Sequence, residues 1–236
     1  MSRNHSVPAP RSLLLCVALL LAVPAIAASS LLNSLTSKDA SGGLKAALSQ
    51  GIDTAVAQLG APNGFLNDPK VVIPLPPALQ KADRALRLVG MNKDADSLKA
   101  AMNHAAESAV ANAKPVFKQA LQKMTLADAK AILTGGDDAG TQYFRKATSD
   151  PLTAQFKPII ARETAKLNLA GLYDRYAGKA ADFGLIPAQD ANLNDYVTNK
   201  ALDGLFSRVA DEERAIRKDP MGQASSLIKK VFSAAQ

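Results

Sequence analysis

Apolar residues recur every three or four positions through most of this chain, and this spacing constrains the fold more than any other feature. On a helix turning about 100° per residue, the apolar positions of residues 94–113 fall on one face. Similar runs cover residues 42–59, 77–89, 116–124, 126–133, 139–148, 151–160, 169–179, 194–218 and 227–232. No run of β-branched residues typical of strands interrupts them. The sequence therefore predicts an all-α fold, a single globular multi-helix domain of about eight to ten helices.

One stretch breaks the helical pattern. Residues 65–77, FLNDPKVVIPLPP, hold four prolines. Proline lacks a backbone N–H and its ring clashes with the preceding helical turn, so this stretch is neither a helix nor an interior strand. We expect an extended Pro-rich segment laid across helices, with residues 71–73 pairing briefly.

Helix boundaries can also be placed. Thr125 and Asp128 have the spacing of a capping box, which predicts a helix over residues 126–133. Gly135-Gly136 ends it, and a further helix is expected from about Ala139 to Thr148. Asp150-Pro151 has the cap-then-proline pattern of a new helix start, with Pro158 expected to kink that helix.

The first residues have the pattern of an export signal. Two arginines precede an apolar run over residues 13–26, and Ala25-Ile26-Ala27 supplies a small-x-small cleavage pattern. Pro24 interrupts the run, which is shorter than the ~20 residues needed to span a bilayer. We therefore predict a cleaved signal peptide over residues 1–27, a flexible leader over 28–41 and the helical domain over 42–236. The predicted location is periplasmic, with secretion left open.

Cleavage at this position narrows the possible chemistry. It removes the only cysteine, Cys16, and one of the two histidines, leaving His104. A disulfide scaffold, a thiol nucleophile and a Cys/His zinc site are thereby excluded. The full chain carries a formal charge of +7, but its basic residues alternate with acids. This mildly basic surface favours weak contact with anionic lipid, whereas nucleic acid is not expected as a partner.

The segment GGDDAGTQYFRK, residues 135–146, is the only place where flexible backbone, adjacent carboxylates, aromatic rings and a guanidinium occur together. Asp137 and Asp138 are candidate ligands for a divalent cation, although their spacing fails the EF-hand pattern and no other cofactor is indicated. The alternative is that both aspartates cap the helix beginning near Ala139.

Other candidate residues lie outside that segment. His104 and Glu107 are three apart on one helix, which suits a structural pair. Asp203-Gly204 falls mid-helix, where glycine costs ~1 kcal/mol relative to alanine. We hypothesise that Gly204 admits a crossing helix and that Asp203 pairs with a buried base, Arg145. The candidate ligand-binding residues are Asn103, Glu107, Asp137, Asp138, Tyr143, Arg145 and Asp203, with a core position as the alternative for Tyr143.

Four segments together resemble a bacterial family of uncharacterised exported proteins, domain-of-unknown-function family 4197. They are IPLPPAL (73–79), AMNHAAE (101–107), GGDDA through TQYFR (135–145) and LDGLF (202–206). The resemblance implies an exported, helical protein of the bacterial envelope and brings no known activity. The family is associated with arginine at the place of His104, which argues against histidine chemistry there.

These observations favour a non-enzymatic envelope protein that binds a ligand or a partner protein in the periplasm. The expected groove is bordered by residues 135–145 and by the face bearing Asn103 and Glu107. Two alternatives stay open. One is a carboxylate-based or metal-assisted hydrolase using Glu107, Asp137 and Asp138. The other is a peripheral membrane protein docking through residues 227–232, which carry Lys229 and Lys230.

Overall fold

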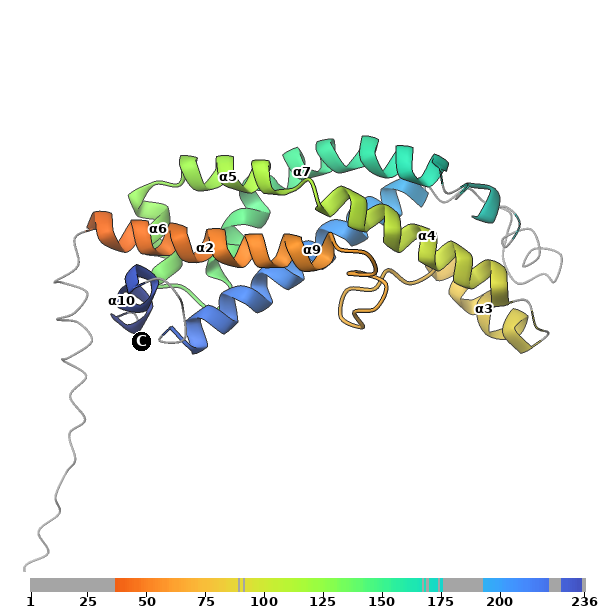
Figure 1. Ribbon diagram of the computed structural model, residues 1–236, viewed down its shortest axis with the longest axis horizontal. Helices are drawn as coiled ribbons and strands as arrows, with labels where there is room; N and C mark the ends of the chain where they lie inside the picture. Colours follow the sequence, from red (N-terminus) through yellow and green to blue (C-terminus); the bar gives the residue numbers. More distant parts are fainter. Residues whose placement is uncertain are drawn as a thin grey trace, which may run out of the picture.

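The chain is an elongated all-helical bundle, as the sequence predicts (Figure 1). It is seen in a computed structural model that describes residues 37–88, 90, 92–166, 168, 170–173, 175, 193–220 and 226–234. The predicted signal peptide and most of the predicted helix over 169–179 lie outside these residues. The helices are α2 (Ser37–Leu59), α3 (Pro77–Leu88), α4 (Asn92–Val110), α5 (Lys114–Lys123), α6 (Leu126–Leu133), α7 (Ala139–Lys166), α9 (Leu193–Lys218) and α10 (Ser226–Ala234).

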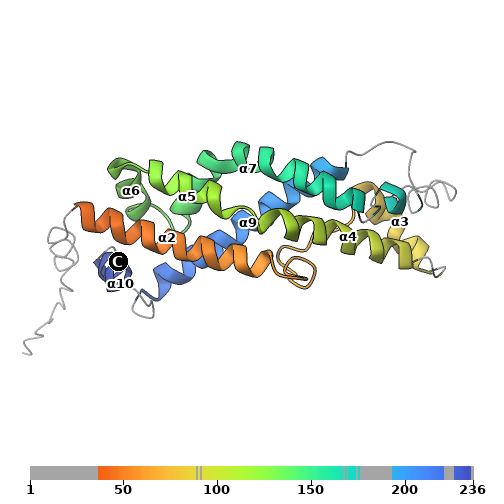
Figure 2. The ribbon, with the colours of Figure 1, turned by 45° about the horizontal axis from the view of Figure 1, so that its top comes forward.

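Helix α9 is the centre of the packing. It contacts α7, α2 and α4, while α10 packs on α2 (Figures 1 and 2). Three fully buried rings, those of Phe117, Phe144 and Phe206, join α5, α7 and α9 edge to face, with centroids 5.3 and 6.1 Å apart. Edge-to-face contacts are a preferred geometry for aromatic pairs. Within the described ranges, no helix combines the length and apolar character needed to cross a membrane.

Helix α7 is one helix where the sequence suggested two. It runs from Ala139 through Pro151 and Pro158 to Lys166 without a break. Each proline removes a donor from the carbonyl four residues earlier. Both prolines and both of those residues, Ala147 and Ala154, are exposed, so water can solvate the freed carbonyls. The expected helix start at Asp150-Pro151 is therefore wrong.

Helix α2 begins at Ser37, before the expected start at Gly42, so the last residues of the predicted leader are helical. Gly42 and Gly43 lie inside the helix, where they face α10. A Cβ at Gly43 would lie 2.5 Å from Val231 Cγ2 and 2.9 Å from the Leu227 carbonyl oxygen. The missing side chain thus permits α10 to pack closely on α2, and the glycines do not mark a helix boundary.

The capping box at the start of α6 is confirmed. The Asp128 N–H donates to Thr125 Oγ1, and the Thr125 N–H donates to Asp128 Oδ2. These bonds from the Thr125 backbone and hydroxyl lower the pKa of Asp128 below its ordinary value, because they favour the charged carboxylate. The cap fixes where α6 starts and therefore where the turn that follows it lies.

The Pro-rich segment forms turns over residues 61–71 and an extended stretch over 72–76. Ile73 pairs with a side-chain amide in place of a strand: its N–H donates to Asn103 Oδ1 at 2.8 Å, and Asn103 Nδ2 donates to its carbonyl at 3.0 Å. The Tyr196 hydroxyl donates to the Pro74 carbonyl at 3.0 Å. Helices α4 and α9 thus provide the polar partners that a neighbouring strand would otherwise supply.

Candidate functional site

The candidate residue Glu107 is a buried structural clamp, with 5% of its surface exposed. Its Oε1 accepts from the N–H groups of Phe65 at 3.1 Å and Leu66 at 3.3 Å, and its Oε2 accepts from the Asn63 N–H at 3.1 Å. Asn63 has a φ of 63°, in the left-handed region, so the carboxylate stabilises a tight turn. Both oxygens are occupied by the protein itself.

His104 is the remaining neighbour of Glu107, with Nδ1 2.9 Å from Oε2. The pair is half-buried as a whole, since 40% of the imidazole and 6% of the carboxylate side chain are exposed. It matches the structural pair expected from the sequence. The side-chain amide of Asn103, one position before His104, is hydrogen-bonded to the backbone of Ile73. This face of α4 therefore binds the chain's own loop.

A second buried carboxylate, Glu213 on α9, does the same for the start of α7, and the sequence analysis missed it. Its Oε1 accepts from the Gly140 N–H at 2.9 Å, and its Oε2 accepts from the N–H and hydroxyl of Thr141, each at 2.8 Å. First-turn N–H groups lack partners within their own helix. For Gly140 and Thr141 the cap comes from α9, not from Asp137 or Asp138.

Arg217 extends this second clamp. Its Nη2 donates to Glu213 Oε1 and to the Ile132 carbonyl, each at 2.9 Å, and its guanidinium lies 5.5 Å from the centre of the Phe232 ring. One side chain thus joins α9, the end of α6 and α10. The Glu213–Arg217 spacing of four residues on a helix was the available signal.

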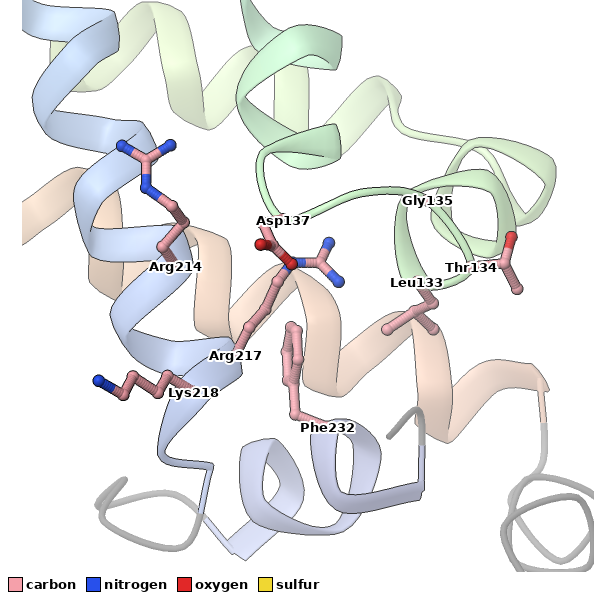
Figure 3. A pocket seen from close by; sticks show the side chains of 8 residues that line it. All are labelled: Leu133, Thr134, Gly135, Asp137, Arg214, Arg217, Lys218 and Phe232. Atoms are coloured by element: carbon pink, nitrogen blue, oxygen red, sulfur yellow. The ribbon is translucent and has the colours of Figure 1, made fainter. Parts of the chain in front are cut away.

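A cavity of about 550 Å³ opens beside Arg217 at this end of the bundle (Figure 3). Its walls come from the α6–α7 turn, from the end of α9 and from α10. The residues that line it are Leu133, Thr134, Gly135, Asp137, Arg214, Arg217, Lys218 and Phe232. The cavity combines an aromatic ring and a leucine with charges of both signs, and most of its lining residues are polar.

The charges on the walls differ in whether they are already neutralised. Arg217 is paired with Glu213, and Arg214 Nη2 lies 2.6 Å from Asp211 Oδ1. Asp137 and Lys218 are both exposed, and within the described part of the chain neither side chain makes a hydrogen bond or an ion pair. Helices α6 and α9 both end here, so their C-terminal dipoles favour the cations already present.

The remaining candidate residues lie elsewhere. Tyr143 packs against the core and donates to the Ala120 carbonyl at 3.1 Å, and burial raises its pKa above the ordinary value. Asp138 accepts from Gln142 Nε2 at 3.1 Å. Of the seven candidates, only Asp137 lines the cavity. In the described ranges no cluster of three or more His, Cys, Asp or Glu residues is placed to hold a metal ion.

Asp203 and Arg145 do meet, but at the surface. Arg145 Nη1 lies 3.5 Å from Asp203 Oδ1, with 45% and 60% of the two side chains exposed, and the guanidinium also lies 4.7 Å from the centre of the Phe206 ring. The hypothesis that Asp203 pairs with a buried base is wrong in that respect. Gly204 admits the Phe65 ring in place of a crossing helix, since its Cβ would lie 2.6 Å from Phe65 Cε1.

The fold and the cavity define an elongated all-α domain whose polar residues mostly fasten its own loops and helix ends. Residues 34–233 match the family model described as "Protein of unknown function (DUF4197)". The chain belongs to the DUF4197 family, as its segments suggest. No curated protein and no solved structure matches the chain significantly.

Proposed function

We propose that this protein is a non-enzymatic binding protein of the bacterial periplasm that takes a small ligand bearing an anionic group. The ligand site is the cavity between the α6–α7 turn, α9 and α10. The observation that carries the proposal is the set of three basic side chains, Arg214, Arg217 and Lys218, that α9 presents to one cavity beside the Phe232 ring. Of the residues expected to border the groove, Gly135 and Asp137 line this cavity, whereas Asn103 and Glu107 do not.

The position of Arg217 supports this proposal. Glu213 and the Ile132 carbonyl hold its Nη2, and Phe232 lies against its face, so the guanidinium is fixed before any ligand arrives. A pre-positioned charge loses little side-chain entropy on binding. Arg214 and Lys218 are more exposed and add charge at the rim.

The distribution of carboxylates favours binding over hydrolysis. Glu107 is committed to three backbone N–H groups, and Asp138 lies outside the cavity that Asp137 lines. A pair of acids working on one bond must face one cleft. The membrane alternative has less support, because the apolar residues of α10 (Ile228, Val231 and Phe232) are buried.

Titration calorimetry with propyl phosphate tests the binding proposal. We expect millimolar or tighter binding that weakens as salt is added, because surface charges are screened. Lys218→Ala should weaken binding roughly three- to tenfold. Lys200→Ala, on the exposed surface of the same helix and outside the cavity, is the matched control and should bind like the wild type. No heat of binding up to about 10 mM propyl phosphate would refute the proposal.

The periplasmic location is tested separately. Residues 1–27 fused to a reporter that is active only outside the cytoplasm should give activity, because the segment has the charged, apolar and small-residue regions of a signal peptide. Replacing Leu19 and Leu20 by arginine should abolish it, since the apolar region would be interrupted. A reporter that stays inactive with the native segment would contradict the location.

A further inference from the structure

We infer that the ligand of this cavity is a zwitterion, a small molecule or head group that carries an ammonium group together with an acidic group. The inference rests on the proposed function and names its ligand class. It follows from two charges of opposite sign, those of Asp137 and Lys218, that line one cavity and do not pair with each other.

The two charges belong to different elements. Asp137 lies in the α6–α7 turn, and Lys218 is the last residue of α9. In the view of Figure 3, Asp137, Arg217 and Phe232 project toward one another, while the Lys218 side chain extends away from them. The other cations of the wall already have carboxylate partners, Asp211 for Arg214 and Glu213 for Arg217. Among the residues that the structure describes, the charges of the site without such a partner are therefore one anion and one cation.

A simple anion does not satisfy this arrangement. It would gain from Lys218 and the two arginines, but it would also be repelled by the Asp137 carboxylate. A simple cation has the opposite difficulty, because the described residues of the wall include three basic side chains and one acid. A zwitterion places its acidic group against the end of α9 and its ammonium group against Asp137, so opposite charges meet at both ends.

The apolar part of the wall fits the same ligand. Phe232 and Leu133 lie on the α10 and α6 sides of the cavity (Figure 3). The short hydrocarbon link between an ammonium and an acidic group can pack there without leaving a polar group unpaired. Phosphoethanolamine has this chemistry, either as a free molecule or as the head group of a phospholipid.

The test compares two probes of nearly equal size, phosphoethanolamine and propyl phosphate, which has a methyl group in place of the ammonium. Titrated into the full chain, phosphoethanolamine should bind roughly tenfold more tightly. Asp137→Asn should abolish this preference by weakening phosphoethanolamine, while propyl phosphate should bind slightly more tightly because the repulsion is removed. Asp138→Asn changes the neighbouring carboxylate, which lies outside the cavity, and should leave the preference intact. Thermal unfolding of each variant shows that the comparison is made on folded protein.

The outcomes separate this inference from the proposed function. If both probes bind equally and Asp137→Asn tightens both, the site takes simple anions, and the zwitterion inference is overturned while the proposed function stands. If neither probe binds, both fail. If wild-type protein, but not Asp137→Asn, binds vesicles containing phosphatidylethanolamine and leaves phosphatidylcholine vesicles unbound, the zwitterion is a lipid head group. Binding confined to free phosphoethanolamine supports a soluble ligand.

Discussion

The molecule uses the same device twice, at Glu107 and at Glu213, and Arg217 connects the second one to the cavity described above. Each glutamate is almost fully buried, at 5% and 3% exposed, and each accepts three hydrogen bonds from a segment far away in sequence. Glu107 on α4 holds the turn after α2. Glu213 on α9 holds the start of α7.

The difference lies in the partner that each carboxylate has on its own helix. Glu107 meets His104, a neighbour on its own helix, and the network ends there. Glu213 meets Arg217, which continues to the Ile132 carbonyl and the Phe232 ring at the cavity wall. The first clamp therefore only holds a loop, whereas the second also fixes a charge at the proposed binding site. A buried carboxylate does not by itself indicate a functional site. That indication comes from the groups that its partner contacts.

Removing either clamp should have the largest effect on stability. We expect Glu213→Ala and Glu107→Ala each to lower the free energy of unfolding by about 3–5 kcal/mol, because each leaves buried N–H groups without acceptors. Urea-induced unfolding followed by circular dichroism measures both.

The two variants should differ in binding. Glu213→Ala frees Arg217 and should weaken propyl phosphate at a temperature where the variant is folded, whereas Glu107→Ala should leave binding unchanged. Equal losses of affinity in both variants would contradict the conclusion that only the Glu213 clamp supports the binding site.

The amide of Asn103 is the next largest contribution. Asn103→Ala should cost about 2–3 kcal/mol, because the Ile73 N–H and carbonyl would both lose their partner in a buried place. Asn112→Ala is the matched control, since its exposed side-chain amide donates to the Ser108 carbonyl. It should change the free energy of unfolding by less than about 0.5 kcal/mol. If the two substitutions lowered the free energy of unfolding equally, the hydrogen bonds between Asn103 and Ile73 would not be what orders the extended segment.

The adjacent residues Gly42 and Gly43 test how closely α10, which carries Phe232, must pack on α2. Gly43→Ala should cost about 1–3 kcal/mol, because its Cβ would meet Val231 and the Leu227 backbone of α10 at under 3 Å. Gly42→Ala places its Cβ at an ordinary 3.6 Å from Leu227 and should gain up to ~1 kcal/mol from helix propensity. Because α10 carries Phe232, only Gly43→Ala should also weaken propyl phosphate binding. A stabilising Gly43→Ala would show that α10 does not need this close approach.

Periodicity was enough to predict the all-α fold and most of its helices, because burial of an apolar stripe repeats every three to four residues. The capping box at Thr125 was also predictable, because it depends on two residues that are close in the sequence. The continuity of α7 was not predictable, since it depends on Pro151 and Pro158 facing solvent. Glu213 was also missed, because its partners Gly140 and Thr141 are distant in sequence. Local pattern identified Asp137, but only the fold brings α9 and Phe232 beside it.

The smallest expected effect concerns Arg145 and Asp203, which belong to neither clamp. Their 3.5 Å contact is exposed, so water and salt screen it, and its coupling energy should be below about 1 kcal/mol. Arg145→Glu with Asp203→Arg should recover little of the stability lost in the single variants, since Arg145 also loses its packing over Phe206. A double-mutant cycle in urea measures the coupling. A coupling of 2 kcal/mol or more, well above the range expected for exposed pairs, would make this pair a second polar fastening of α7 to α9 besides Glu213.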